Sequence, residues 1–138
     1  MTELAARASR RYVLDASVVV DLLVASDSAE LAERIGDGEW HAPALVDYAV
    51  VAALRGLVLG RHLTPGRAVD ALVDLDQLDL TRWEPDLPSH RRALALRDHC
   101  TAYDATYVAC AEGVDAVLVT RDQRLGRAAA DLLTLLLV

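Results

Sequence analysis

The sequence predicts an α/β fold in which a mostly parallel central sheet is covered by helices on both faces. Strand-like and helical segments alternate along the chain, which is typical of parallel sheets joined by helical crossovers. The segment 116–120 is apolar and β-branched, as expected of a strand buried on both faces. With 138 residues, of which 54% are hydrophobic, the chain has the size of one compact domain. We therefore predict a single domain over residues 1–138, in which residues 1–10 form a flexible N-terminal tail.

The first strand and the two helices after it are predicted from short apolar runs and capping residues. Residues 12–15 are predicted to form a strand, and residues 16–25 follow as an apolar helix. A second helix is predicted over 28–35, because Asp27 or Ser28 can cap its start and a glycine can end it. The chain therefore opens with one strand and a pair of helices.

The middle of the chain is predicted to form one strand and two further helices. Residues 40–43 are short and strand-like. Residues 44–59 form a strongly apolar helix that ends at a glycine. The next helix, ending near residue 75, starts with Thr64 as its N-cap and Pro65 at its first position. These two helices are expected to follow one another closely.

The last part of the chain keeps the order of strand followed by helix. This order favours parallel pairing throughout, because each helix returns the chain to the same edge of the sheet. The predicted elements are a strand at 78–83, helices at 89–99 and 103–112, the strand at 116–120, a helix at 121–132 and a final leucine-rich strand.

Composition and charge narrow the range of functions. The net charge of −7 argues against indiscriminate binding to nucleic acid, which depends on a surplus of basic side chains. All 14 basic residues are arginine, which excludes mechanisms that need a lysine. Cys100 and Cys110 are predicted to be small buried hydrophobes. No apolar run approaches the roughly 20 residues of a membrane helix and no secretory signal is visible, so we expect a cytoplasmic protein.

Three aspartates are candidates for a metal site. Asp15 and Asp122 follow predicted strands, at the edge where the crevice of a parallel sheet forms, and Asp104 starts a helix. Each can instead serve as a helix N-cap, and Thr101 with Asp104 resembles a capping box. Three carboxylates at one edge would repel one another unless a cation neutralised them. Oxygen ligands of this kind favour Mg²⁺ or Mn²⁺ as the cofactor.

Four short motifs together resemble those of a known family. The motifs are VLDAS at 13–17, HAPALVD at 41–47 with ALR at 53–55, YDATY at 103–107 and VTRDQRL at 119–125. In this order they resemble the PIN-domain ribonucleases, particularly the VapC toxins of toxin–antitoxin systems. The resemblance implies a PIN-like three-layer fold and a Mg²⁺- or Mn²⁺-dependent endoribonuclease that hydrolyses RNA phosphodiester bonds. It also implies a homodimer that a VapB-like antitoxin silences.

The resemblance assigns roles to individual residues. Asp15, Asp104 and Asp122 match the family's metal-holding acids and are the expected catalytic set. Ser17 and Thr120 match small hydroxyl residues that lie beside these acids. The same aspartates that the strand ends single out are therefore the ones that the family pattern selects.

One acidic residue of the family pattern is missing from this chain. Ala49 occupies the catalytic position where the pattern has a glutamate. Asp47 is the nearest replacement beside the metal, but two residues along a helix correspond to about 200° of rotation, so it should project elsewhere. The predicted function is therefore an endoribonuclease that Ala49 can impair. The alternative is a catalytically inactive PIN domain that binds an antitoxin or RNA.

Arginines after the third aspartate are candidates for binding the substrate. Arg121, Arg124 and Arg127 recur at three-residue spacing on the predicted helix, so at least part of this row could hold RNA phosphate. A row of solvent-facing arginines is the other interpretation of the same spacing.

Other enzyme classes lack their motifs in this sequence. The four histidines show no paired ligand spacing, and no Walker loop, Gly-x-Ser-x-Gly or Gly-x-Gly-x-x-Gly motif occurs. A receiver domain would need a lysine. A haloacid-dehalogenase-like phosphatase would need Asp-x-Asp, where this chain has Asp15 and Ser17.

Overall fold

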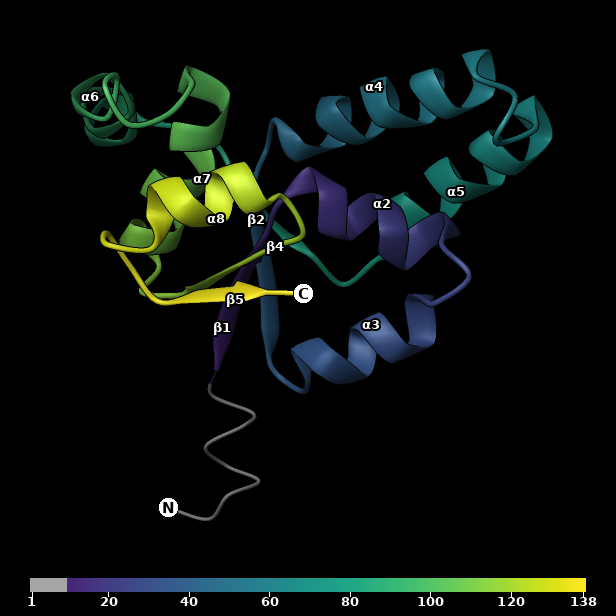
Figure 1. The fold of residues 1–138 in the computed structure, drawn as a ribbon, viewed down its shortest axis with the longest axis horizontal. Helices are drawn as coiled ribbons and strands as arrows, with labels where there is room; N and C mark the ends of the chain where they lie inside the picture. The colour runs from purple at the N-terminus through teal and green to yellow at the C-terminus, as the bar shows by residue number, and fades with distance from the viewer. Residues whose placement is uncertain (1–9) are drawn as a thin grey trace.

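The computed structural model describes residues 10–138, and the predicted tail at 1–10 lies outside this range apart from Arg10. Its centre is a five-stranded sheet of order β3-β2-β1-β4-β5 in which every neighbouring pair is parallel (Figure 1). The prediction of a mostly parallel sheet is therefore confirmed. The strands are β1 (Arg11–Leu14), β2 (Glu39–Pro43), β3 (Thr81–Trp83), β4 (Val117–Thr120) and β5 (Leu135–Leu137).

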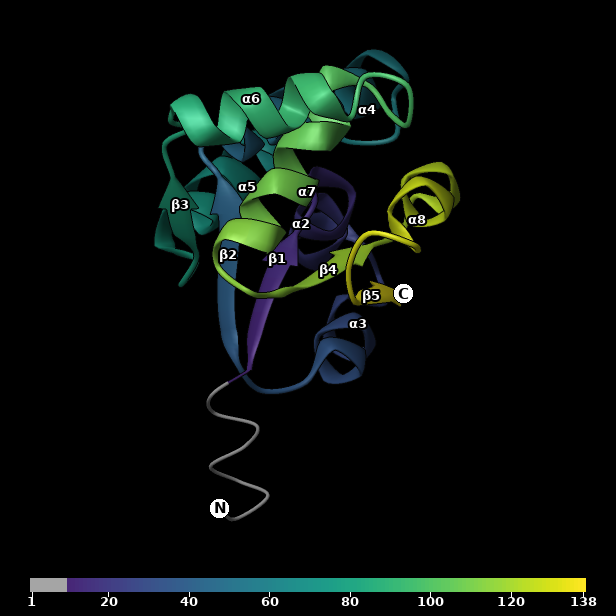
Figure 2. The same ribbon diagram turned by 90° about the vertical axis from the view of Figure 1, so that its left-hand side faces the viewer.

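Seven helices in the described part of the chain surround this sheet. They are α2 (Ala16–Val24), α3 (Ser28–Ile35), α4 (Val46–Leu59), α5 (Pro65–Gln77), α6 (Leu87–Ala95), α7 (Ala102–Gly113) and α8 (Gln123–Ala129). Figure 2 shows α7 in front of β1 and α2 behind it. α6 packs against α7, and α2 contacts α3, α4 and α5. The result is the expected arrangement of helices on both faces of a sheet.

Local capping explains where several helices begin and end. Thr64 Oγ1 accepts a hydrogen bond from Arg67 N at the start of α5, as the sequence predicts. Gly36 ends α3 with a φ of 83°, a conformation that favours glycine. Asp86 caps α6 by accepting from Ser89 N, so this helix begins before the predicted residue 89.

Several predicted elements are shorter in the structure than in the sequence-based assignment, among them one strand and one helix. The strand expected over 78–83 has only three residues, because α5 continues to Gln77 and Leu78 closes that helix with an N–H bond to its last turn. The helix expected over 121–132 starts only at Gln123, because Asp122 is its N-cap, and it ends at Ala129.

The strand order of the sheet reverses at β1, because the chain runs outward from β1 to β3 and then returns to the other side of β1 at β4. This strand pairs with β2 on one side and β4 on the other, and Leu14 lies opposite Val119. Ligands of such sheets bind where the strand order reverses, at the carboxyl ends of the strands. Val13, Leu14, Leu118 and Val119 are completely buried and hold these two strands in place. None of the helices in residues 10–138 combines the length and apolar character that a membrane crossing requires.

Candidate metal centre

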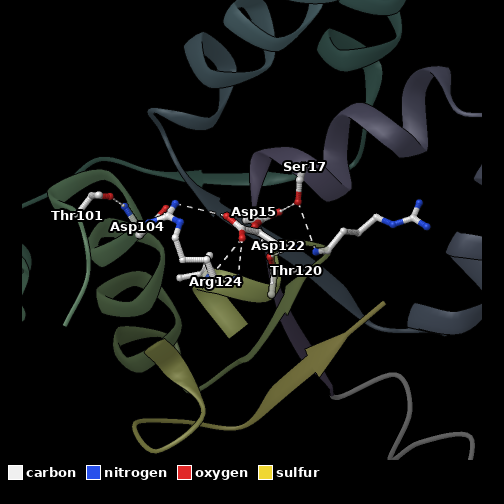
Figure 3. Close-up of polar contacts among 9 residues, drawn as sticks. Asp15, Ser17, Thr101, Asp104, Thr120, Asp122 and Arg124 are labelled. Atoms are coloured by element: carbon white, nitrogen blue, oxygen red, sulfur yellow. Dashed lines mark hydrogen bonds and ion pairs between the residues drawn. The ribbon is translucent and has the colours of Figure 1, made fainter. Parts of the chain in front are cut away.

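Asp15 directly follows β1 and caps α2. Its Oδ1 accepts hydrogen bonds from Val18 N at 3.2 Å and from Ser17 Oγ at 2.5 Å, and its Oδ2 accepts one from Thr120 Oγ1 (Figure 3). Only 5% of the residue is exposed. Asp15 is therefore an N-cap, but one that is buried and held by two hydroxyl groups in addition to the backbone.

Burial makes the charge of Asp15 costly. Loss of solvation raises the pKa of Asp15, and the hydrogen bonds from Ser17, Thr120 and Val18 lower it only in part. The negative charge of Asp122 raises this pKa further. A cation in the neighbourhood would favour the ionised carboxylate and offset part of the cost of burial.

Thr120 links two of the three aspartates across the β1–β4 pair. Asp122 Oδ1 accepts from Arg124 N at 2.9 Å and from Leu125 N at 3.4 Å, so this oxygen caps α8. Asp122 N donates to Thr120 Oγ1 at 2.9 Å. The Thr120 hydroxyl, which is fully buried, donates in turn to Asp15. The Thr120 side chain therefore links the residues that follow the carboxyl ends of β1 and β4.

Asp104 lies in the first turn of α7, and its carboxylate is only partly satisfied. Thr101 Oγ1 accepts from Asp104 N at 3.2 Å, which is half of the predicted capping box. Asp104 Oδ2 is buried and has no partner in hydrogen-bond geometry, although Arg124 Nη2 lies 2.9 Å away. The same Arg124 nitrogen is 3.5 Å from Asp122 Oδ2. The Arg124 guanidinium thus stands between these two carboxylates (Figure 3).

The three aspartates line one cavity of about 240 Å³ at the carboxyl ends of β1 and β4. Within residues 10–138, no three His, Cys, Asp or Glu side chains are gathered closely enough to form a finished metal site. A larger cavity of about 620 Å³ beside α3 contains none of the three aspartates. The other residues that line the smaller cavity are Ala16, Ser17, Leu45, Ala49, Tyr103 and Tyr107.

Ala49 and Asp47 lie in different places although both belong to α4. Ala49 is on the wall of the cavity, so its methyl group faces the site where the family pattern has a glutamate. Asp47 does not line the cavity, and both of its carboxylate oxygens lie 2.9 Å from Arg82 Nε on β3. Asp47 therefore does not replace the missing glutamate beside the metal, because the helix turns it away, as the rotation of about 200° predicts, and Arg82 holds it there.

The three predicted RNA-binding arginines do not form a row along one helix. Arg121 precedes α8, and its guanidinium forms ion pairs with Asp21 at 3.1 Å and Asp27 at 3.3 Å. Arg127 is exposed on α8. Of the three, Arg124 is the one whose side chain contacts aspartates of the cavity. Arg124 and Arg127 keep the predicted three-residue spacing on α8, whereas Arg121 lies outside the helix because Asp122 is its N-cap.

Tyr107 is a site residue that the sequence analysis did not assign. It lines the cavity, is 5% exposed, and its hydroxyl has no hydrogen-bond partner, since its contact with the backbone of Ala16 does not reach hydrogen-bond geometry. Burial raises the pKa of Tyr107, and the nearby Asp15 carboxylate adds to the effect. The sequence could have indicated Tyr107, because residues 104 and 107 lie three apart and therefore share a helix face with the candidate ligand Asp104.

The donor set fits a hard divalent cation in its chemistry. All three candidates are carboxylates, and Asp104 Oδ2 is a buried oxygen that lacks a hydrogen-bonded donor. The Arg124 guanidinium already places a positive charge between Asp104 and Asp122. These carboxylates could therefore hold Mg²⁺ or Mn²⁺ in competition with the Arg124 guanidinium.

Comparison with known proteins gives one family. The family model described as PIN domain matches residues 12–131. Ribonuclease VapC12 of Mycobacterium tuberculosis is 36% identical over 116 residues, covering 83% of this chain and 89% of the relative. VapC ribonuclease Mb0985 of Mycobacterium bovis is 34% identical over 113 residues, covering 75% of this chain and 88% of the relative.

Solved structures share the fold. PAE2754 from Pyrobaculum aerophilum superimposes with a TM-score of 0.64 at 24% identity, covering 87% of this chain and 86% of that one. VapBC-1 from nontypeable Haemophilus influenzae gives a TM-score of 0.65 at 14% identity, covering 92% of this chain and 97% of that one. At these identities the similarity is evidence for the fold.

Proposed function

The chain belongs to the PIN-domain family, and on this premise we propose that it is a VapC-type endoribonuclease, the toxin of a toxin–antitoxin pair. The main support for this proposal is the cavity that the three aspartates line. Carboxylates from three separate elements line it at the point where the strand order reverses, and the buried Asp104 Oδ2 has an ion pair with Arg124 but no hydrogen bond. This is a suitable place for a divalent cation and a phosphodiester.

Asp15, Asp104 and Asp122 would hold Mg²⁺ or Mn²⁺ in this proposal. Bound there, the cation would stabilise negative charge on the phosphodiester and supply a reactive water for hydrolysis. Ser17 and Thr120 hold the Asp15 carboxylate in a fixed orientation through their hydroxyl groups. In this proposal the three aspartates provide negative charge for the cation, and Ser17 and Thr120 position the Asp15 carboxylate.

We infer that Arg124 binds the RNA substrate in the proposed reaction. Once its guanidinium leaves the carboxylates, it is placed at the rim of the cavity to bind an RNA phosphate by paired N–H donors. Its side chain is 59% exposed, which leaves it free to change partners. Arg121 is held by Asp21 and Asp27 and is less suited to this task.

Ala49 is expected to impair catalysis. A carboxylate at this position would add negative charge to the metal site or orient the attacking water, and a methyl group does neither. The same observation favours a second candidate function. In that account the chain is an inactive PIN domain that binds an antitoxin or RNA without cutting it.

A VapB-like antitoxin is the proposed protein partner, and a homodimer the proposed assembly. The similarity to VapBC structures supports the first, and the net charge of −7 would suit a partner segment rich in arginine or lysine. Co-purification with the protein encoded beside this chain tests the pairing, and light scattering tests the dimer. No affinity for that neighbouring protein would count against the toxin–antitoxin part of the proposal.

Cleavage of pooled cellular RNA with Mg²⁺ or Mn²⁺ tests the function. The three proteins to compare are the chain itself, Ala49→Glu, and Ala49→Glu combined with Asp15→Asn. We expect Ala49→Glu to cut RNA faster than the chain, and both EDTA and Asp15→Asn to abolish the cutting. If Ala49→Glu is as inert as the chain on every RNA, the nuclease proposal loses its support and the binding module becomes the better account.

A further inference from the structure

An exposed tyrosine forms part of the cavity that holds the three aspartates. Tyr103 lines this cavity and is 75% exposed, so its ring contributes little to the hydrophobic core. The neighbouring Tyr107, on the same helix and in the same cavity, is 5% exposed and is part of the packed interior. Tyr103 is therefore an exposed aromatic side chain in the same cavity as the three aspartates, where its ring is available for contact with a ligand.

The position of Tyr103 is fixed by the start of α7. Thr101 caps this helix through Asp104 N, which sets the backbone of the whole first turn. Tyr103 immediately precedes Asp104, so the aromatic ring and a candidate metal ligand leave adjacent positions of the same turn. A nucleic acid whose phosphate lies at the carboxylates would therefore bring a neighbouring base close to the ring.

The negative net charge of the chain makes a contact between an RNA base and Tyr103 important for RNA binding. With a net charge of −7, the protein cannot rely on general attraction to phosphates for RNA binding. Single-stranded RNA is commonly held by stacking its unpaired bases on exposed aromatic rings, a contact that every base can make. In the cavity, the carboxylates could hold a cation that binds the phosphate, and the exposed aromatic ring could contact a base.

We propose that Tyr103 is a base-stacking residue that holds a nucleotide beside the scissile phosphate of single-stranded RNA. This inference rests on the proposed function, because it uses the same cavity and the same substrate class. It adds that the substrate is unpaired at the cut site and that affinity depends on a base next to it. Tyr103 acts by positioning the RNA.

The test is binding of a fluorescently labelled single-stranded RNA, measured by anisotropy with Ca²⁺ in place of Mg²⁺ and checked by gel for intact RNA. Four proteins are compared on one oligonucleotide and on a matched oligonucleotide that carries abasic positions. They are the full chain, Tyr103→Ala, Tyr103→Trp and Tyr48→Ala. Tyr48 is the matched control, since it is 82% exposed on α4 and does not line the cavity.

We expect Tyr103→Ala to weaken binding of the intact oligonucleotide about 5- to 150-fold, the range for loss of one base–aromatic stack. Tyr103→Trp and Tyr48→Ala should bind within about twofold of the chain, because the first keeps an aromatic face and the second leaves the cavity unchanged. On the abasic oligonucleotide the chain and Tyr103→Ala should bind equally. Circular dichroism confirms that each variant is folded.

Equal binding by the chain and Tyr103→Ala would overturn the inference, as would equal losses on both oligonucleotides or no RNA binding by the chain. A Tyr103→Ala variant that binds RNA normally but loses the antitoxin would show that the ring is a protein contact instead. Cleavage of pooled RNA decides the proposed function separately. RNA that is cut equally by Ala49→Glu with and without Tyr103→Ala would refute the stacking role and leave the nuclease intact.

Discussion

Replacing Thr120 by valine should destabilise the fold and do so mainly at neutral pH. Valine keeps the shape of the side chain but removes the hydroxyl that donates to Asp15 and accepts from Asp122 N at 2.9 Å. Thr120 is fully buried, so water cannot take the place of the lost groups. The Asp15 carboxylate would lose one of its donors, and a backbone N–H would lose its acceptor.

The size of the effect follows from these two bonds. A hydrogen bond to a charged group contributes about 1.5–3 kcal/mol and a neutral one about 0.5–1.5 kcal/mol. The added methyl group returns about 0.8 kcal/mol through burial. The net loss in the free energy of unfolding should be about 1–4 kcal/mol, which corresponds to a fall in Tm of about 4–13 °C for a chain of this size.

The pH dependence identifies Asp15 as the source. Burial already raises the pKa of Asp15, so its ionisation costs stability as the pH rises from its unfolded value through the folded one. Loss of the Thr120 donor raises this pKa further. The penalty of Thr120→Val should therefore be full at neutral pH and shrink toward about pH 4, as protonation of the Asp15 carboxyl removes the charge that the hydroxyl stabilises.

Urea unfolding followed by circular dichroism at both pH values measures this prediction. Thr120→Ser is the control, since it keeps the hydroxyl and loses only a methyl group, so its penalty should not depend on pH. A loss below about 0.5 kcal/mol for Thr120→Val, or a loss of equal size at both pH values, would refute the reasoning.

Three further predictions follow from the site and its surroundings. Arg124→Ala should tighten Mn²⁺ binding several-fold in calorimetry, because it removes the positive charge within 3.5 Å of Asp104 and Asp122; unchanged or weaker binding would contradict this. Asp47→Asn should cost at most about 1 kcal/mol in urea unfolding, because its side chain is 41% exposed, and should leave Mn²⁺ affinity unchanged. Burial raises the pKa of Cys110 to about 11, so this thiol stays protonated at neutral pH and should react with iodoacetamide at least about tenfold more slowly than free cysteine; rapid labelling in a chain without the other cysteine would argue against it.

Much of the fold is predictable because its signals are local. Short apolar runs and capping residues identify the strands and most helix boundaries, as Thr64 at the start of α5 and Gly36 at the end of α3 illustrate. Parallel pairing follows from the alternation of strands and helices, and it places Asp15 and Asp122 at one edge. That edge is where the structure has the cavity.

The parts that the sequence could not supply depend on pairs of residues far apart in the chain. The bond from Arg82 to Asp47 joins residues 35 positions apart, and the pairing of Arg121 with Asp27 joins residues 94 positions apart. No periodicity encodes such partners. Arg124 lies between two carboxylates, and Tyr103 is exposed. Both features likewise depend on the three-dimensional packing of the side chains.

The most direct test of the account is Mn²⁺ binding, measured by calorimetry on the chain and on single aspartate-to-asparagine variants. Asn caps helices as well as Asp does, so the substitution separates capping from metal binding. Asp86 provides the control, because it is a fully exposed N-cap that does not line the cavity. We predict that Asp86→Asn binds Mn²⁺ as the chain does, while the corresponding changes at Asp15, Asp104 and Asp122 each weaken binding at least about tenfold. Equal Mn²⁺ affinity in all four variants would contradict the account and leave these three aspartates as helix caps alone.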